Sequence, residues 1–91
     1  MMHDLVNWYV SHCDGEWEHG YGITIETLDN PGWAVNITGA SDKQDFHIKT
    51  EGDKRWLHIK ATSTEFSGYG DESRLVELLS IATKWLNNDI E

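Results

Sequence analysis

The chain has 91 residues, a formal net charge of −9 from 16 acidic and 7 basic side chains, and five tryptophans. This length predicts one domain over residues 1–91, and the sequence lacks both the apolar run of a membrane span and the basic start of a signal peptide, so we expect a cytoplasmic protein. The acidic charge disfavours direct binding to the phosphate backbone of nucleic acid and favours a basic protein as partner.

The first predicted element is a short amphipathic helix over residues 4–13. Four apolar side chains follow the i, i+3, i+4, i+8 spacing of one helix face: Leu5, Trp8, Tyr9 and Cys13. Asp4 can accept hydrogen bonds from free amides of the first turn, and Asp14–Gly15 supplies the stop. The single cysteine, Cys13, cannot form an internal disulfide, and we expect it to be a small buried hydrophobe at the end of this helix.

A β-hairpin is predicted over residues 21–38. Both of its arms alternate apolar and polar side chains with the period of a strand. Between the arms, the ring of Pro31 fixes its φ at about −65°. Gly32 is expected to accept the positive φ that the third position of a type II turn requires.

Two further strands are predicted over residues 45–50 and 55–62, joined by a turn at residues 51–54. Each places its apolar side chains on one face. Residues 63–70 contain two aromatic side chains among small ones, so both a loop and a fifth short strand remain open there.

Strands that alternate in this way have one buried and one wet face. The wet face is expected to carry the polar partners of the buried residues: Thr24, Glu26, Asn36, Thr38, His47, Lys49, Trp56, His58 and Lys60.

A second helix is predicted to begin at residues 71–73, where acidic side chains suit the positive helix end and Asp71 or Ser73 can act as the cap. Its apolar stripe consists of Leu75, Leu78, Leu79, Ala82, Trp85 and Leu86. The predicted fold class is therefore α+β, with a four- to five-stranded antiparallel sheet and the N-terminal and C-terminal helices packed on one face.

The tryptophans supply core area that the modest aliphatic content lacks, because each can bury on the order of 200 Å². Trp8 and Trp85 lie on the helix stripes and Trp33 on the inward strand face. Trp17 and Trp56 remain as the candidates for exposure.

The densest group of polar side chains lies between the first helix and the hairpin. Asp14, Glu16 and Glu18 recur at every second residue, and carboxylates crowded together raise one another's proton affinity or bind a cation. With His19 they define one alternative, a small carboxylate- or metal-dependent hydrolase. Because no established metal-binding motif is present, the metal interpretation is the weaker one, and we assign no catalytic residue, metal ligand or cofactor.

Three stretches have an unusual, tryptophan-rich pattern: Trp8–Tyr9, the run CDGEWEHGYGI from Cys13 to Ile23, and the run ETLDNPGW from Glu26 to Trp33. Together they resemble the signature of the immunity protein 53 family, the antidote proteins of bacterial polymorphic-toxin systems. The match is close over residues 5–37 and weaker beyond them. The resemblance implies a protein that binds a cognate toxin domain and neutralises it.

An acidic protein suits a toxin with a basic, phosphate-seeking surface, such as a nuclease. The candidate toxin-binding residues are four carboxylates and two possible aromatic anchors: Asp14, Glu16, Glu18, Glu26, Trp17 and Trp56. Two other interpretations stay open. Trp17, Glu18 and His19 can instead be scaffold at the corner between helix and sheet, and the whole protein can be a general acidic adaptor for a basic host protein.

Overall fold

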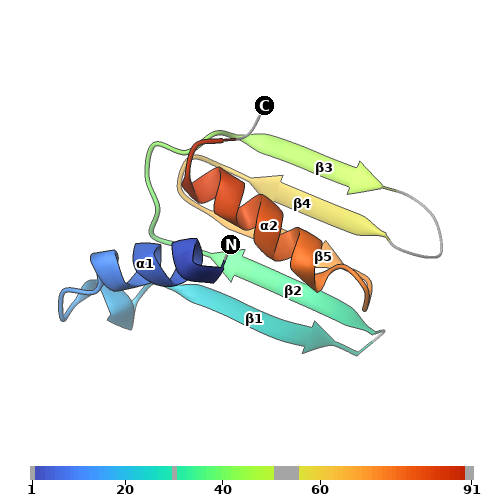
Figure 1. Ribbon diagram of the computed structural model, residues 1–91, viewed down its shortest axis with the longest axis horizontal. Helices are drawn as coiled ribbons and strands as arrows, with labels where there is room; N and C mark the ends of the chain where they lie inside the picture. Colours follow the sequence, from blue (N-terminus) through green and yellow to red (C-terminus); the bar gives the residue numbers. More distant parts are fainter. Residues whose placement is uncertain (1, 30, 51–55, 90–91) are drawn as a thin grey trace.

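The computed structural model describes residues 2–29, 31–50 and 56–89. In chain order its elements are α1 (Met2–His12), the 3-10 helix η1 (Trp17–His19), β1 (Ile23–Leu28), β2 (Gly32–Ile37), β3 (Phe46–Thr50), β4 (Leu57–Ala61), β5 (Phe66–Gly70) and α2 (Leu75–Leu86) (Figure 1). All strand pairs are antiparallel, so the predicted α+β class is confirmed, with five strands.

The sheet has the order β1-β2-β5-β4-β3, so the segment at residues 63–70, where a loop or a strand was open, contains the central strand, β5. The small residues of β5 explain its position under α2. A Cβ atom on Gly68 would lie 2.9 Å from Leu78 Cδ2, and one on Gly70 would lie 2.6 Å from Arg74 Cβ. The glycines therefore let the helix approach the middle of the sheet closely.

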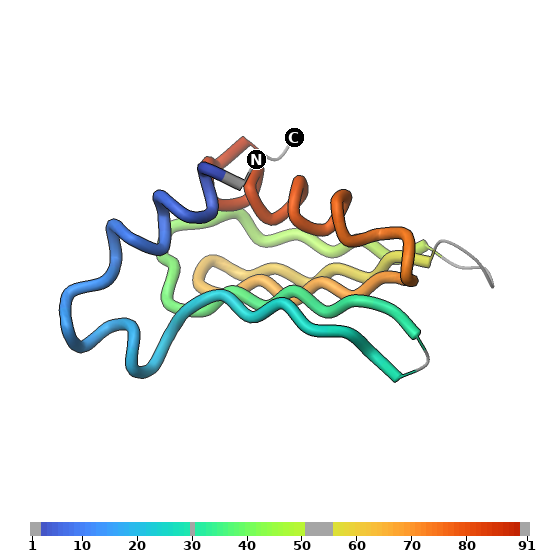
Figure 2. Tube along the Cα trace, turned by 60° about the horizontal axis from the view of Figure 1, so that its bottom comes forward, coloured from blue at the N-terminus to red at the C-terminus, as the bar shows by residue number. Residues whose placement is uncertain are grey.

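Both helices lie on the same side of the sheet (Figure 2), as predicted. The core between α2 and the sheet consists of aliphatic and aromatic side chains, the largest of which are Trp85, Phe66, Ile37, Ile59, Leu78 and Val35. The Trp85 ring lies 5.6 Å from that of Phe66, and its Nε1 donates to the carbonyl oxygens of Gln44 (3.1 Å) and Thr62 (3.2 Å). One side chain therefore connects the helix to two loops.

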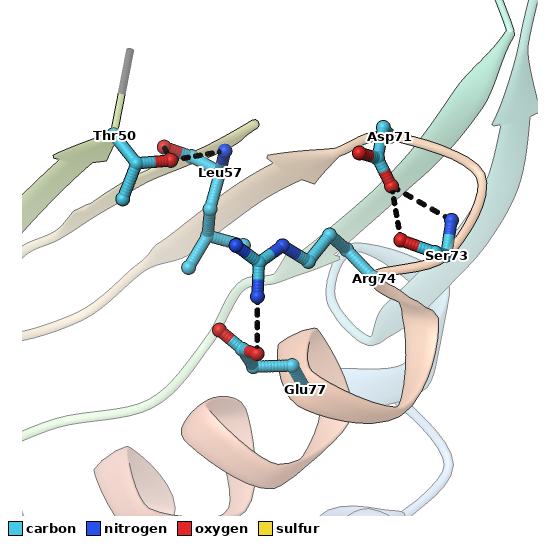
Figure 3. Close-up of polar contacts among 6 residues, drawn as sticks. All are labelled: Thr50, Leu57, Asp71, Ser73, Arg74 and Glu77. Atoms are coloured by element: carbon cyan, nitrogen blue, oxygen red, sulfur yellow. Dashed lines mark hydrogen bonds and ion pairs between the residues drawn. The ribbon is translucent and has the colours of Figure 1, made fainter. Parts of the chain in front are cut away.

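Polar contacts fix both ends of α2, and Figure 3 shows those at its N-terminal end. The Asp71 carboxylate accepts hydrogen bonds from the amide (2.8 Å) and hydroxyl (2.6 Å) of Ser73 and orders the turn before the helix. The N-cap position itself is Arg74, which pairs with Glu77 and has no side-chain cap, so the expected capping role of Asp71 or Ser73 is replaced by this turn. At the other end, Lys43 Nζ donates to the Leu86 carbonyl (2.7 Å), as suits a negative helix end.

Two further local expectations, at Cys13 and Gly32, were wrong. Cys13 lies beyond the end of α1 and is exposed, and its thiol donates to the Tyr9 carbonyl oxygen (3.2 Å). Gly32 has no positive φ; it pairs with Leu28 as the first residue of β2, where a Cβ atom would meet the Gly70 carbonyl oxygen at 2.4 Å. Glycine is required there by close backbone approach. The predicted turn at residues 51–54 and Asn30 lie outside the described residues.

Candidate functional site

Residues 13–22 form the corner between α1 and β1. Two carboxylates stabilise this corner, because each accepts hydrogen bonds from backbone amides near the other. Asp14 Oδ1 accepts the amides of Glu16 and Trp17, each at 2.9 Å. The Glu18 carboxylate accepts the amides of Asp14 (3.0 Å) and Gly15 (2.9 and 3.1 Å) in return. These bonds satisfy the amides at the start of η1 and fix the direction in which the chain enters the sheet.

The same hydrogen bonds determine the ionisation of both groups. The amides of Trp17 and Glu16 hold the pKa of Asp14 below its usual value of 3.8. For Glu18, its own backbone amide and then those of Asp14 and Gly15 hold the pKa below 4.5. Both carboxylates are therefore charged at neutral pH, and a general base of low pKa with its lone pairs bound to amides is a poor one. This geometry gives the hydrolase alternative no support at Asp14 or Glu18.

Trp17 occupies the centre of an aromatic cluster at the corner. Its ring centroid lies within about 6 Å of four others, those of His12 (5.2 Å), Trp8 (5.4 Å), Tyr9 (5.9 Å) and Tyr21 (6.0 Å). Its Nε1 donates to the Gly39 carbonyl oxygen (3.3 Å), and a Cβ atom on Gly39 would lie 2.6 Å from that nitrogen. Trp17 is half-buried and joins α1 to the loop after β2, which favours the scaffold interpretation for this side chain.

A polar hollow of about 320 Å³ lies beside the corner. Its walls come from α1, η1, the start of β1 and the end of β2, and they include Tyr9, Glu18, His19, Thr24, Asn36 and Thr38. The charged Glu18 and the neutral hydrogen-bonding groups around it suit a basic side chain.

The structure brings four of the six candidate residues together and separates the other two. Asp14, Glu16, Trp17 and Glu18 share the corner. Glu26 is exposed farther along β1, on the sheet face away from the helices. Trp56 is half-buried, and its carbonyl accepts the amide of Asp71.

Trp56 therefore lies level with the far end of β1, because Gly70, just before Asp71, pairs with Trp33. At about 3.3 Å per residue, that end is about 17 Å from the corner. The separation places Trp56 and Trp17 on different parts of the molecule.

One contributor to the site was assigned to the core by its spacing. Tyr9 follows the apolar stripe of α1, yet it is 38% exposed and lines the polar hollow. Its phenol group was the available signal, because tyrosine suits a boundary that is apolar on one side and wet on the other. Within residues 2–29, 31–50 and 56–89, no group of three or more metal-ligating side chains is found. No helix in the same ranges is long and apolar enough to cross a membrane.

The fold defines a small acidic α+β domain, and carboxylates and aromatic rings fix the conformation of the corner between α1 and β1. A family model described as immunity protein 53 matches residues 2–87, and the chain belongs to the immunity protein 53 family. The match confirms the resemblance and covers the second half of the sheet as well. No curated protein and no solved structure matches the chain. Membership of the family supports an immunity function and implies a cognate toxin as partner.

Proposed function

We propose that this protein is a cytoplasmic immunity protein that neutralises a basic toxin domain of a polymorphic-toxin system by binding it, without chemistry of its own. The observation that carries this proposal is the charge of the N-terminal part. Residues 1–42 contain seven acidic side chains and no lysine or arginine. Such a surface attracts a basic partner and disfavours acidic ones.

The contact is assigned to the acidic side chains that the scaffold leaves available. Asp14 and Glu18 hold the corner, yet they keep their charge and contribute to the field around it. Glu16 and Glu26 are exposed, and within the described residues neither carboxylate has a hydrogen-bond or ion-pair partner. These two groups are free to meet basic side chains of the toxin.

The experiment is co-expression with the toxin encoded by the neighbouring gene, followed by measurement of the complex. The wild-type protein is expected to restore growth and to form a complex with that toxin domain. The double variant Glu16→Gln/Glu26→Gln is expected to associate with the toxin domain on the order of 3- to 10-fold more slowly, because it lacks two of the negative charges that attract a basic partner.

The matched control is Asp45→Asn/Glu72→Gln, which removes two exposed charges outside the N-terminal part. Asp45 directly precedes β3, which forms the sheet edge opposite β1. We expect the association rate of this control to change by less than about twofold. Failure of the wild-type protein to rescue growth or bind would remove the proposal. Equal slowing in both double variants would remove the assignment of the contact to the N-terminal part.

A further inference from the structure

The β1 strand forms an edge of the sheet, with β2 as its one neighbour in the described part of the chain (Figure 1). The amide of Thr38 donates to the Gly22 carbonyl oxygen (3.0 Å), so this antiparallel pair is a hydrogen-bonded one. Since such pairs alternate along a ladder, Thr24, Glu26 and Leu28 also bond to β2. The backbone groups of Ile23, Ile25 and Thr27 therefore point outward from the sheet.

An apolar groove of about 220 Å³ runs along the same edge, between α1 and β1. It is lined by Leu5, Val6, Tyr9, Ile23 and Ile25, of which Val6 is 53% and Ile25 is 42% exposed. Exposed aliphatic side chains beside an unpaired strand edge promote association, and natural proteins normally cover or charge such an edge.

The charges around the groove select its occupant. Tyr9 and Ile23 line both the groove and the polar hollow, so the ionised Glu18 lies at one end of the groove. Glu26 follows Ile25 on the other face of the same strand, and no lysine or arginine occurs before Lys43. A second copy of this chain would bring acidic groups against acidic groups, whereas a segment with basic and apolar side chains is complementary.

We propose that the α1–β1 groove and the outer edge of β1 bind an extended segment of the toxin domain, in which apolar side chains enter the groove and lysine or arginine side chains meet Glu18 and Glu26. The segment pairs with the outward backbone groups of β1 and adds a sixth strand to the sheet. This inference rests on the proposed toxin-binding function and names the surface that performs it.

The groove is tested with two matched variants that leave the net charge unchanged. Val6→Asn removes an apolar side chain from the groove, and Val76→Asn makes the same change on the exposed face of α2, where Val76 is 67% exposed. With an inactivated form of the neighbouring gene's toxin domain as probe, Val6→Asn is expected to raise Kd at least about tenfold and Val76→Asn less than about twofold.

Strand addition is tested separately. Thr27→Pro removes an outward amide that β2 does not use, which an edge strand tolerates, and it is expected to weaken binding at least about tenfold while the thermal unfolding transition remains. If this variant does not fold, hydrogen exchange on the wild-type complex tests strand addition instead. The amides of Ile23, Ile25 and Thr27 should become protected from exchange on binding.

The outcomes separate the inference from the proposed function. Where the wild-type protein rescues growth, two results would count against the groove: Val6→Asn binds within twofold of wild type, or the amides of Ile23, Ile25 and Thr27 stay unprotected. Either result would overturn the assignment of binding to the α1–β1 groove and leave the toxin-binding function intact. A wild-type dimer that forms through β1 and dissociates in Thr27→Pro would overturn the choice of occupant. Absence of rescue and of complex for the wild-type protein would instead remove the proposed function.

Discussion

Asp14 and Glu18 show how residue type and role separate within one short segment. Their spacing with Glu16 suggested a cluster of three equivalent carboxylates, but two of them accept backbone amides and only Glu16 is exposed with a carboxylate free of such bonds in the described chain. The same residue type thus supplies both the structure of the corner and a candidate contact.

A pH dependence follows from these two carboxylates. Their pKa values are lower in the folded protein than the ordinary 3.8 and 4.5, so in acid the unfolded chain binds more protons. The stabilisation is fully present above about pH 4.5 and is lost as the pH falls through the folded-state values. Urea unfolding between pH 7 and pH 3 should show this decrease.

The variants Asp14→Asn and Glu18→Gln are expected to be less stable at pH 7 and to lose less stability in acid than the wild type. Glu16→Gln serves as the control, because its carboxylate makes no hydrogen bond in the described part of the chain. If the free energy of unfolding of all three variants falls with pH as steeply as that of the wild type, the stability of the corner does not depend on ionised carboxylates.

At the scale of the elements, α2 is held to the sheet chiefly through Trp85. The ring is fully buried against Phe66. Its Nε1 donates to two loop carbonyls, that of Gln44 just before β3 and that of Thr62 just after β4. Helix docking and loop position are therefore coupled in this fold.

Replacement of Trp85 by phenylalanine is expected to lower the free energy of unfolding by about 2–4 kcal/mol, because it leaves a void and two carbonyls without their donor. The control is Trp33→Phe, at a half-buried ring with one hydrogen bond to the Glu72 carbonyl (3.1 Å), where we expect about 1 kcal/mol. Chemical denaturation measures both. Equal losses would mean that the coupling through Trp85 is absent.

The elements also show why the sequence predicts some parts of this fold and not others. The alternating strands and both helices follow from periodic apolar positions, since burial selects those patterns directly. The central position of β5 does not, because Gly68 and Gly70 weaken the strand pattern and are explained only by the approach of α2. The exposure of Cys13 likewise depends on where α1 ends, and the groove depends on two elements meeting.

At the scale of the whole molecule, the charge is distributed unevenly along the chain. The acidic N-terminal part contains both the corner and β1, while the wet face of β3 and β4 carries Lys49, Lys60 and the neighbouring rings of His47 and His58 (5.3 Å between centroids). This uneven charge produces an electrostatic field that attracts a basic partner toward the α1–β1 side of the molecule.

Association with the toxin domain should accordingly depend on ionic strength. Between 0.05 and 0.5 M NaCl we expect the association rate to fall on the order of tenfold and the dissociation rate to change far less, because salt screens the approach more than the apolar contact. Stopped-flow mixing measures both rates. The variant Glu16→Gln/Glu26→Gln should show a shallower salt dependence, and a rate independent of salt in the wild type would contradict electrostatic steering.

The reciprocal bonds of the corner have a consequence for how such a protein can evolve. Asp14 and Glu18 bond to backbone amides, so the corner does not specify the side chain of Glu16, whose amide any residue except proline can provide. Gly15, with φ of +98°, and Trp17, at the centre of the aromatic cluster, remain constrained. Exposed positions such as Val6, Glu16 and Glu26 can then be exchanged at small cost in stability. A lineage facing a changing toxin can alter its recognition at these positions while inheriting the same fold.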